Sequence, residues 1–287
     1  MVREWTRADA ARALRRPTAD DDKYSRGVLG MRTGSEAYPG AAVLGVEAAW
    51  RTGLGMVRYL GPDRPTGLVL ARRPETVTAD GRVQAWVIGS GTDASARTPS
   101  ETATLRGLLS DTDPVVVDAG ALDLAAEATA PRILTPHDRE HARLRAALGL
   151  GHTPSDRVVA ARETAEATGA VVLLKGAVTV VVAPDGWAAT VEAGTPWLAT
   201  AGTGDVLAGA IGALVAGATA TDEHVDAASL AALAASGAWL HGRAGALAAQ
   251  GASIAGAASS PPFGDGPITA LDVAEALPRA VAELLSR

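Results

Sequence analysis

The chain has 287 residues, with 47% hydrophobic and 20% charged side chains, which is typical of a globular protein and excludes the low-hydrophobicity pattern of a disordered one. Its 26 basic and 32 acidic residues give a formal net charge of −6, and no run of lysine or arginine indicates a nucleic-acid partner. The sequence contains no cysteine, which excludes disulfides, thiolate metal sites and a cysteine nucleophile together.

The first sixteen residues carry charged side chains along their length and lack the continuous apolar core of a signal peptide. No apolar run approaches the roughly 20 residues that a membrane-spanning helix needs. The absence of cysteine also fits a reducing compartment. We therefore predict a cytoplasmic protein. Because no composition break, repeat or linker divides residues 1–287, we also predict a single domain.

Four short apolar runs, each followed by a polar or turn-forming residue, predict buried strands at residues 83–88, 115–117, 132–134 and 171–174. Segments with helical periodicity lie between them, at residues 100–109, 137–148 and 156–168. Strands that alternate with helices in this way imply right-handed crossovers. The sequence therefore predicts an α/β fold in which helices cover both faces of a mostly parallel sheet.

After residue 174 this alternation is interrupted. Residues 179–183 and 187–191 resemble strands, and the turn-forming sequence Pro184-Asp185-Gly186 lies between them, so we expect a hairpin near residues 179–191. Three helices are predicted to follow, at residues 203–216, 225–249 and 270–285. The second is so rich in alanine that it must pack closely against a neighbour or line an interface.

The most informative motif, Gly202-Thr203-Gly204-Asp205, opens the first of these three helices. Its glycines let backbone N–H groups converge at the positive end of the helix, which together predict an anion site. A carboxylate beside a bound phosphate is repelled, so Asp205 needs a role such as taking a proton from the hydroxyl that attacks a phosphoryl group. The alternative is that Thr203 or Asp205 is only the helix N-cap.

A second motif, Lys175-Gly176-Ala177-Val178-Thr179, follows a predicted strand. There a lysine can reach a phosphate, and the glycine permits close backbone approach. The motif lacks the spacing of a P-loop, and Lys-Gly is also an ordinary turn sequence. Its position one hairpin before Asp205 is what favours a phosphate-binding role.

In their order along the chain, the motifs closely resemble those of the ADP/ATP-dependent NAD(P)H-hydrate dehydratases, a carbohydrate-kinase-like family of the ribokinase-like superfamily. The resemblance extends over about residues 24–285, and it implies a ribokinase-like fold with the nucleotide at the carboxyl ends of the strands. The motifs that carry it are Tyr38-Pro39-Gly40-Ala41-Ala42, Gly89-Ser90-Gly91, Asp118-Ala119-Gly120-Ala121-Leu122, Leu134-Thr135-Pro136-His137, Lys175-Gly176-Ala177-Val178-Thr179 and Gly202-Thr203-Gly204-Asp205.

The resemblance also implies a reaction. The ring hydroxyl of the hydrated cofactor (S)-NAD(P)HX is phosphorylated by ADP or ATP, and phosphate is then eliminated to regenerate NAD(P)H. Asp205 is the implied catalytic base. The implied substrate-binding residues are Ala41, Gly91, His137 and Asp205, and the implied nucleotide-binding residues are Lys175, Gly176, Ala177, Val178, Thr179 and Gly204.

Magnesium is the expected cofactor, although no motif names its ligands and we predict no metal-binding residues. Bacterial relatives favour ADP over ATP as the co-substrate, and the family resemblance suggests a homotetramer. An N-terminal epimerase domain, present in many bacterial members, has no room in this chain. A further departure is Gly89-Ser90-Gly91-Thr92-Asp93, where the family usually has Gly-Pro-Gly-Leu-Gly, so that Asp93 adds a carboxylate near the expected dinucleotide phosphates.

Three alternatives compete with this interpretation. Residues 89–94, with Asp118 as a ribose ligand, also fit the dinucleotide fingerprint of a dehydrogenase. Residues 137–141 match the His-x-x-Glu-His zinc pattern, although we interpret His141 as a solvated helix residue. A ribokinase-like kinase of the hydroxyethylthiazole or hydroxymethylpyrimidine type shares the Gly-Thr-Gly-Asp motif. The remaining histidines, among them His241, show no partner in the sequence.

Overall fold

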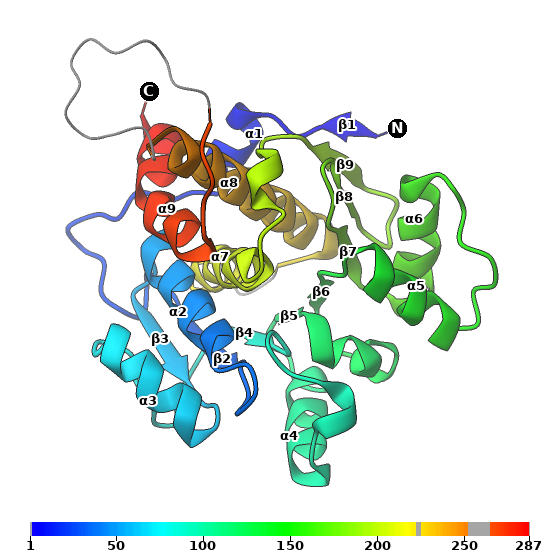
Figure 1. The fold of residues 1–287 in the computed structure, drawn as a ribbon, viewed down its shortest axis with the longest axis horizontal. Coiled ribbons are helices and arrows are strands. Elements are labelled where there is room, and N and C mark those ends of the chain that lie inside the picture. The colour runs from blue at the N-terminus through cyan, green and yellow to red at the C-terminus, as the bar shows by residue number, and fades with distance from the viewer. Residues whose placement is uncertain (1, 222–224, 252–264, 287) are drawn as a thin grey trace.

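The protein is represented by a computed structural model that describes residues 2–221, 225–251 and 265–286 (Figure 1). Within these ranges no helix is long and apolar enough to cross a membrane. A nine-stranded sheet, in the order β1-β9-β8-β7-β6-β5-β4-β2-β3, runs through the described chain. All neighbouring strands are parallel except the pairs β7–β8 and β8–β9, which are antiparallel.

The strands are β1 Arg3–Glu4, β2 Val28–Arg32, β3 Met56–Tyr59, β4 Ala85–Ile88, β5 Val115–Val117, β6 Arg132–Leu134, β7 Val171–Leu174, β8 Thr179–Val182 and β9 Ala188–Val191. The helices are α1 Arg7–Ala11, α2 Gly40–Thr52, α3 Asp63–Arg72, α4 Pro99–Leu109, α5 Asp138–Ala147, α6 Arg157–Thr168, α7 Thr203–Thr219, α8 Ala227–Gly251 and α9 Ala270–Leu285. Three short 3₁₀ segments complete the described elements: η1 Ala94–Ala96, η2 Ala119–Glu127 and η3 Pro196–Leu198.

Helices cover both faces of the sheet, as the sequence predicts (Figure 1). The alternation of side chains along β5 shows why: Val116 packs into the core under α2, α7, α8 and α9, whereas Val115 and Val117 pack into the core under α4, α5 and α6. All three valines are buried, because a central parallel strand has no solvent-facing side.

The predicted strands at residues 115–117, 132–134 and 171–174 match β5, β6 and β7, and the predicted hairpin matches β8 and β9. The helix predicted to start at residue 137 begins instead at Asp138, because His137 is its N-cap. The elements before residue 83 were not predicted. Among them, β2 carries a glycine at its centre, Gly30, where a Cβ atom would lie 2.5 Å from the Trp86 ring.

Small residues let α2 and α7 pack almost backbone to backbone. A Cβ atom added at Gly209 would lie 2.2 Å from the carbonyl oxygen of Gly45. One at Gly45 would lie 3.4 Å from the carbonyl oxygen of Asp205. This close crossing places the N-terminal halves of both helices beside each other at the carboxyl ends of the parallel strands, where the candidate site is built.

Candidate active site

The segments that follow β4, β6 and β7 come together at the carboxyl edge of the sheet. His137 and Lys175, which follow β6 and β7, form an isolated parallel bridge, and the Lys175 amide donates to the carbonyl oxygen of Pro136 at 2.9 Å. The N-terminus of α7 reaches the same place, because a Cβ atom on Gly204 would lie 3.6 Å from Lys175 Nζ. The structure therefore brings together the two motifs that the sequence predicts to bind phosphate, as expected of an α/β site at strand ends.

Ala41 and Gly91, both expected at the substrate, lie in direct contact. Gly91 has a left-handed backbone, with φ of +66°. A Cβ atom there would lie 2.2 Å from Ala41 Cβ and 3.1 Å from the carbonyl oxygen of Tyr38. Only glycine fits this position, because it satisfies both the backbone conformation and the contact.

Asp118, at the end of β5, is the most connected side chain of the site. It is 3% exposed. Its Oδ1 accepts from Lys175 Nζ at 2.9 Å and from Thr135 Oγ1 at 2.7 Å, and its Oδ2 accepts from Ser90 Oγ at 3.0 Å. The next residue, Ala119, has φ of 43°, the single positive φ of a non-glycine residue in the described part of the chain. The sequence motif contains Asp118, but sequence reasoning gave it a role only in the dehydrogenase alternative.

Lys175 lies among acidic groups. Besides its bond to Asp118, its Nζ is 3.8 Å from Glu140 Oε2. Burial acts to lower the pKa of Lys175, but the carboxylates of Asp118, Glu140 and Asp205 outweigh burial and raise it. The lysine therefore keeps its positive charge beside the N-terminus of α7, where an anionic ligand is favoured.

Asp205 lies in the first turn of α7. Burial raises the pKa of its carboxyl group to about 7, the negative charge of Asp118 adds to the increase, and Lys175 opposes it. A carboxyl group with this pKa exchanges its proton near neutral pH, which suits a general base or acid. The N-cap alternative is wrong for Thr203 and Asp205, because the N-cap is Gly202, with φ of 90° and no side-chain cap.

The turn of residues 175–178 is held by an arginine that sequence reasoning missed. Arg157, at the start of α6, donates to the carbonyl oxygens of Lys175 at 2.7 Å and Val178 at 2.5 Å, and it pairs with Asp138 at 3.0 Å. A Cβ atom on Gly176 would lie 2.7 Å from the Arg157 guanidinium. A larger residue at position 176 would therefore displace the Arg157 guanidinium from the turn.

Residues 176–178 are exposed, and Thr179 begins β8. The side chain of Val178 is 38% exposed. The assignment of Ala177 and Val178 to the nucleotide stays a prediction.

His137 is the N-cap of α5 and half exposed. Its Nδ1 accepts from the amides of Arg139 at 3.1 Å and Glu140 at 3.3 Å, so the ring proton lies on Nε2. The Glu140 carboxylate in turn accepts from the His137 amide at 2.9 Å, which completes a capping box. His137 Nε2 lies 3.5 Å from Glu140 Oε1.

His141 was interpreted as a solvated residue, and this is wrong. It is 2% exposed, and its Nε2 lies 2.8 Å from Thr164 Oγ1 in the core. Burial lowers the pKa of His141 to about 4. Because His137 caps the helix while His141 faces Thr164, the two histidines do not form a pair of zinc ligands. The residues that the structure describes contain no cluster of three or more potential metal-binding side chains.

His241, on α8, is a second site neighbour that sequence reasoning missed. It is 9% exposed. Burial lowers its pKa to about 4, a backbone hydrogen bond at Thr203 acts in the opposite direction, and Lys175 lowers it further. His241 is therefore neutral at physiological pH. A lone histidine in an alanine-rich helix was the available signal, but its position beside Thr203 depends on how α8 packs against α7.

A cavity of about 790 Å³ opens next to Gly91 and Tyr38 and extends along η1, η2 and α5. Asp93 and Arg143 line it. The unusual Asp93 caps η1, since its Oδ1 accepts from the Ser95 amide at 2.9 Å and from Ser95 Oγ at 2.8 Å. These bonds, the backbone one foremost, lower the pKa of Asp93, so it brings a negative charge to the cavity wall.

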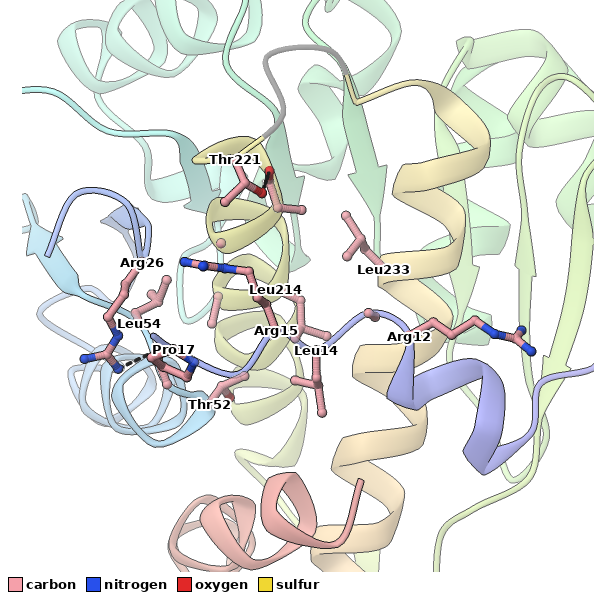
Figure 2. Close-up of a pocket in the computed structure, with 15 residues that line it drawn as sticks. Arg12, Leu14, Arg15, Pro17, Arg26, Thr52, Leu54, Leu214, Thr221 and Leu233 are labelled. Atoms are coloured by element: carbon pink, nitrogen blue, oxygen red, sulfur yellow. Dashed lines mark hydrogen bonds between the residues drawn. The ribbon is translucent and has the colours of Figure 1, made fainter. Parts of the chain in front are cut away.

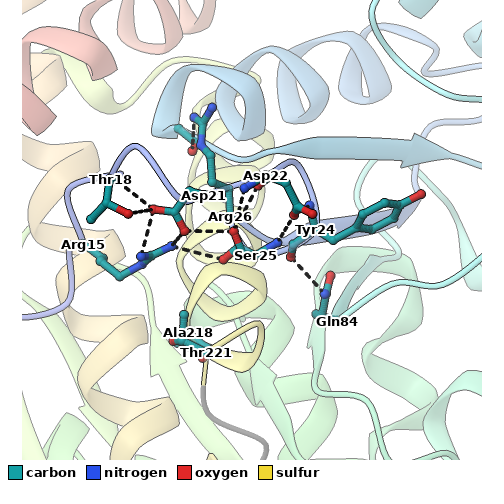
Figure 3. A network of polar contacts seen from close by, with 11 residues as sticks. Arg15, Thr18, Asp21, Asp22, Tyr24, Ser25, Arg26, Gln84, Ala218 and Thr221 are labelled. Atoms are coloured by element: carbon teal, nitrogen blue, oxygen red, sulfur yellow. Dashed lines mark hydrogen bonds and ion pairs between the residues drawn. The ribbon is translucent and has the colours of Figure 1, made fainter.

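Another cavity, of about 260 Å³, lies at the opposite end of α7, beside residues 12–17 (Figure 2). Apolar side chains such as Leu214 and Leu233 line it, together with three arginines. Arg26 donates to the carbonyl oxygen of Gly53 at 2.9 Å. Arg15 forms two bonds to Asp21, within a network that also joins Thr18 and Ser25 to that carboxylate (Figure 3). This cavity is far from the convergent motifs, and its arginines anchor the N-terminal segment.

A mostly parallel sheet between helices, with a helix N-terminus and a lysine at the strand ends, defines a ribokinase-like fold. A family model described as NAD(P)H-hydrate dehydratase matches residues 29–260. The chain belongs to the NAD(P)H-hydrate dehydratase family. This assignment favours the dehydratase over the dehydrogenase and small-molecule kinase alternatives.

Individual relatives agree with the family match. The chain is 46% identical over 222 residues to a bifunctional NAD(P)H-hydrate repair enzyme of Mycobacterium leprae, covering 73% of this chain and 45% of the relative. It is 37% identical over 258 residues to an ADP-dependent (S)-NAD(P)H-hydrate dehydratase of Neisseria meningitidis, covering 82% of each. The chain thus spans less than half the length of the Mycobacterium leprae protein.

Among solved structures, the ADP/ATP-dependent NAD(P)H-hydrate dehydratase of Bacillus subtilis, co-crystallised with ATP and Mg²⁺, superposes with a TM-score of 0.79 at 27% sequence identity. The alignment covers 99% of both chains. The ribokinase-like fold predicted from the sequence is therefore confirmed over nearly the whole chain.

Proposed function

We propose that the protein dehydrates (S)-NAD(P)HX to NAD(P)H at the expense of ADP, which becomes AMP and phosphate. The observation that carries the proposal is the Asp205 carboxyl group, whose pKa is raised to about 7 by burial, at a helix N-terminus that the Lys175 ammonium faces. This arrangement unites a proton acceptor with an anion-binding site, which is what phosphoryl transfer to a hydroxyl requires.

In the first step Asp205 takes the proton of the ring hydroxyl while the oxygen of that hydroxyl attacks the β-phosphorus of ADP. A new O–P bond forms, and the bond to the oxygen of AMP breaks. Lys175 and the amide of Gly204 stabilise the negative charge that develops on the transferring group. In the second step the carbon–oxygen bond breaks and its electron pair leaves with phosphate, while the neighbouring carbon releases its proton to water and the ring double bond forms. The net result is removal of water, because phosphate is a far better leaving group than hydroxide.

The substrate is proposed to lie over Ala41 and Gly91, with its remaining length in the cavity of about 790 Å³. His137, with its proton on Nε2, is placed to donate a hydrogen bond to the hydrated ring. ADP is proposed to lie over the turn of residues 175–179. The name of the Neisseria meningitidis relative supports ADP as the co-substrate.

Magnesium does not fit a protein cage at this site. The Asp118 carboxylate is filled by Lys175, Thr135 and Ser90, and the described residues contain no cluster of three potential ligands. We propose that magnesium accompanies the nucleotide, bound by phosphate oxygens and water.

The proposal is tested with hydrated NADH, which lacks the 340 nm absorbance of NADH. We expect the purified protein with ADP and Mg²⁺ to restore this absorbance. ATP replaces ADP in a parallel reaction. Omission of nucleotide is the control, and it should give no recovery. If neither nucleotide restores the absorbance above that control, the protein is not a dehydratase.

A further inference from the structure

The ammonium group of Lys175 and the carboxyl groups of Asp118 and Asp205 lie close together in the candidate site. Lys175 Nζ is bonded to Asp118 at 2.9 Å, whereas no ion pair joins it to Asp205 among the described residues. Asp118 is held in place by Thr135 Oγ1 and Ser90 Oγ, which occupy the remaining acceptor sites that face them. The Lys175 ammonium therefore points toward Asp118, because the Asp118 carboxylate is held in place by its own hydrogen bonds.

We propose that Asp118 is a positioning residue for the dehydration: it holds the Lys175 ammonium beside the N-terminus of α7 and keeps it from forming an ion pair with Asp205. The inference rests on the proposed function of Asp205 as the base.

The pKa of Asp205 depends on which carboxylate Lys175 neutralises. With Asp118 in place, Lys175 is paired and Asp205 is surrounded by low-dielectric protein and a second negative charge, both of which favour its protonated form. Without Asp118, the carboxylates that act on the ammonium are those of Glu140, at 3.8 Å, and Asp205. An ion-paired Asp205 would bind a proton more weakly and would be a poorer base.

The other neighbours of Asp205 do not replace this effect. Leu44, Gly45 and Ala270, from α2 and α9, surround the Gly202–Asp205 turn with apolar or backbone groups. Glu140, from α5, lies 3.8 Å from Lys175 Nζ, and the charges that shift the pKa of Asp205 are those of Asp118 and Lys175. His241, from α8, is uncharged at neutral pH because burial lowers its pKa to about 4. Asp118 and Lys175 are thus the charged groups that the structure sets against Asp205.

The experiment compares the pH dependence of kcat in the wild type and in Asp118→Asn. We expect the acidic limb of the profile to move to lower pH by about one unit in the variant, and the plateau rate to fall. Thr135→Val is the control, because it removes one bond to Asp118 but keeps both charges; its acidic limb should coincide with that of the wild type. A reduced rate with an unmoved limb in Asp118→Asn would mean that Asp118 is merely structural and would overturn the proposal.

A titration that needs no turnover separates this inference from the proposed function. The carboxyl ¹³C resonance of Asp205, assigned with Asp205→Asn, is followed against pH in the ligand-free protein. We expect its midpoint to fall in Asp118→Asn. If the wild type lacks dehydratase activity, the proposed function fails, and this titration still decides whether Asp118 controls Asp205.

Asp118→Asn leaves a buried ammonium with one partner fewer, and the variant can fail to fold for that reason alone. The double variant Asp118→Asn/Lys175→Met removes the ion pair as a unit and serves, with Lys175→Met, as a second background. Because the proposed effect acts through the lysine, Asp118→Asn should lower the Asp205 midpoint more with Lys175 present than with methionine in its place. An equal decrease in both backgrounds would mean that Asp118 acts only through its own charge, and would overturn the proposal. If Asp118→Asn does not fold, the wild type is compared with Lys175→Met: a rise of about two units or more in the Asp205 midpoint would show that Lys175 already pairs with Asp205, and would equally overturn it.

Discussion

Gly209 of α7 lies against the backbone of Gly45 in α2, so closely that a Cβ atom at Gly209 would come within 2.2 Å of the Gly45 carbonyl oxygen. This contact sets the distance between two helices whose N-terminal halves carry Ala41 and Asp205. It therefore links the packing of the core to the geometry of the candidate site.

Gly209→Ala should destabilise the protein, because the added methyl group forces α2 and α7 apart. We expect the free energy of unfolding to fall by about 1–3 kcal/mol, the usual cost of overpacking. Denaturant unfolding measures it. Gly217→Ala, on the same helix, is the matched control: its Cβ atom would meet only the Arg26 carbonyl oxygen, at 3.8 Å. That variant should be unchanged or slightly more stable, and equal losses in both variants would contradict the explanation.

Asp205→Asn should abolish most of the turnover and keep nucleotide binding. The change removes the proton acceptor but preserves the size of the side chain and the N-terminus of α7. General-base catalysis contributes about 10²- to 10⁴-fold, so we expect a loss of kcat in that range. Steady-state kinetics and calorimetric titration with ADP measure the two properties. Turnover like that of the wild type would exclude Asp205 as the base.

The rate should depend on pH near neutrality. Asp205 acts only when its carboxyl group is deprotonated, and burial raises its pKa to about 7. We therefore expect kcat to rise from pH 6 to pH 8 along a limb with a midpoint of about 7, and to fall roughly tenfold for each unit well below it. An acidic limb centred near 4, the usual range of an aspartate, would show that Asp205 is not the titrating base or is not buried in the complex.

Arg157→Ala should weaken nucleotide binding more than it lowers kcat. The arginine donates to the carbonyl oxygens of Lys175 and Val178, so its removal frees the turn that is proposed to hold ADP. We expect the KM for ADP to rise by about tenfold, which corresponds to one lost charged hydrogen bond. The measurement is the ADP dependence of the initial rate.

The chain offers a matched control for this variant on the same helix. Arg162, also in α6, donates instead to the carbonyl oxygen of Gly186 in the β8–β9 turn, at 3.0 Å. Arg162→Ala should leave the KM for ADP near its wild-type value. A similar rise in both variants would point to a general loosening of α6 rather than to support of the nucleotide turn.

The sequence predicted those parts of the fold that local patterns determine. β5 and β7 are short runs of buried apolar residues, and α9 shows helical periodicity throughout, so their bounds could be predicted closely. β2 carries Gly30 in a central strand, where glycine is required by the Trp86 ring of β4. That requirement comes from tertiary packing, and a pattern search along the chain does not detect it.

The residues of the candidate site also fall into two groups, those that sequence motifs predict and those that only tertiary packing brings there. Gly91, Lys175 and Asp205 lie in glycine-rich motifs at strand ends, so their proximity could be expected from an α/β topology. Arg157 and His241 occur in helices without any local motif, and they reach the site only because of how α6 and α8 pack. His141 was misjudged for the same reason: its side chain points into the core toward Thr164, which is 23 positions away in the sequence.

The three side chains that meet at Asp118 also bear on how the protein folds. Ser90, Thr135 and Lys175 are separated from Asp118 by 28, 17 and 57 positions in the chain. Each bond requires the two strands that carry its residues to be aligned in the sheet, since loop-closure entropy opposes the contact until then. The complete set of bonds to Asp118 therefore forms only when β4, β5, β6 and β7 lie side by side, so partly folded molecules lack this charged cluster.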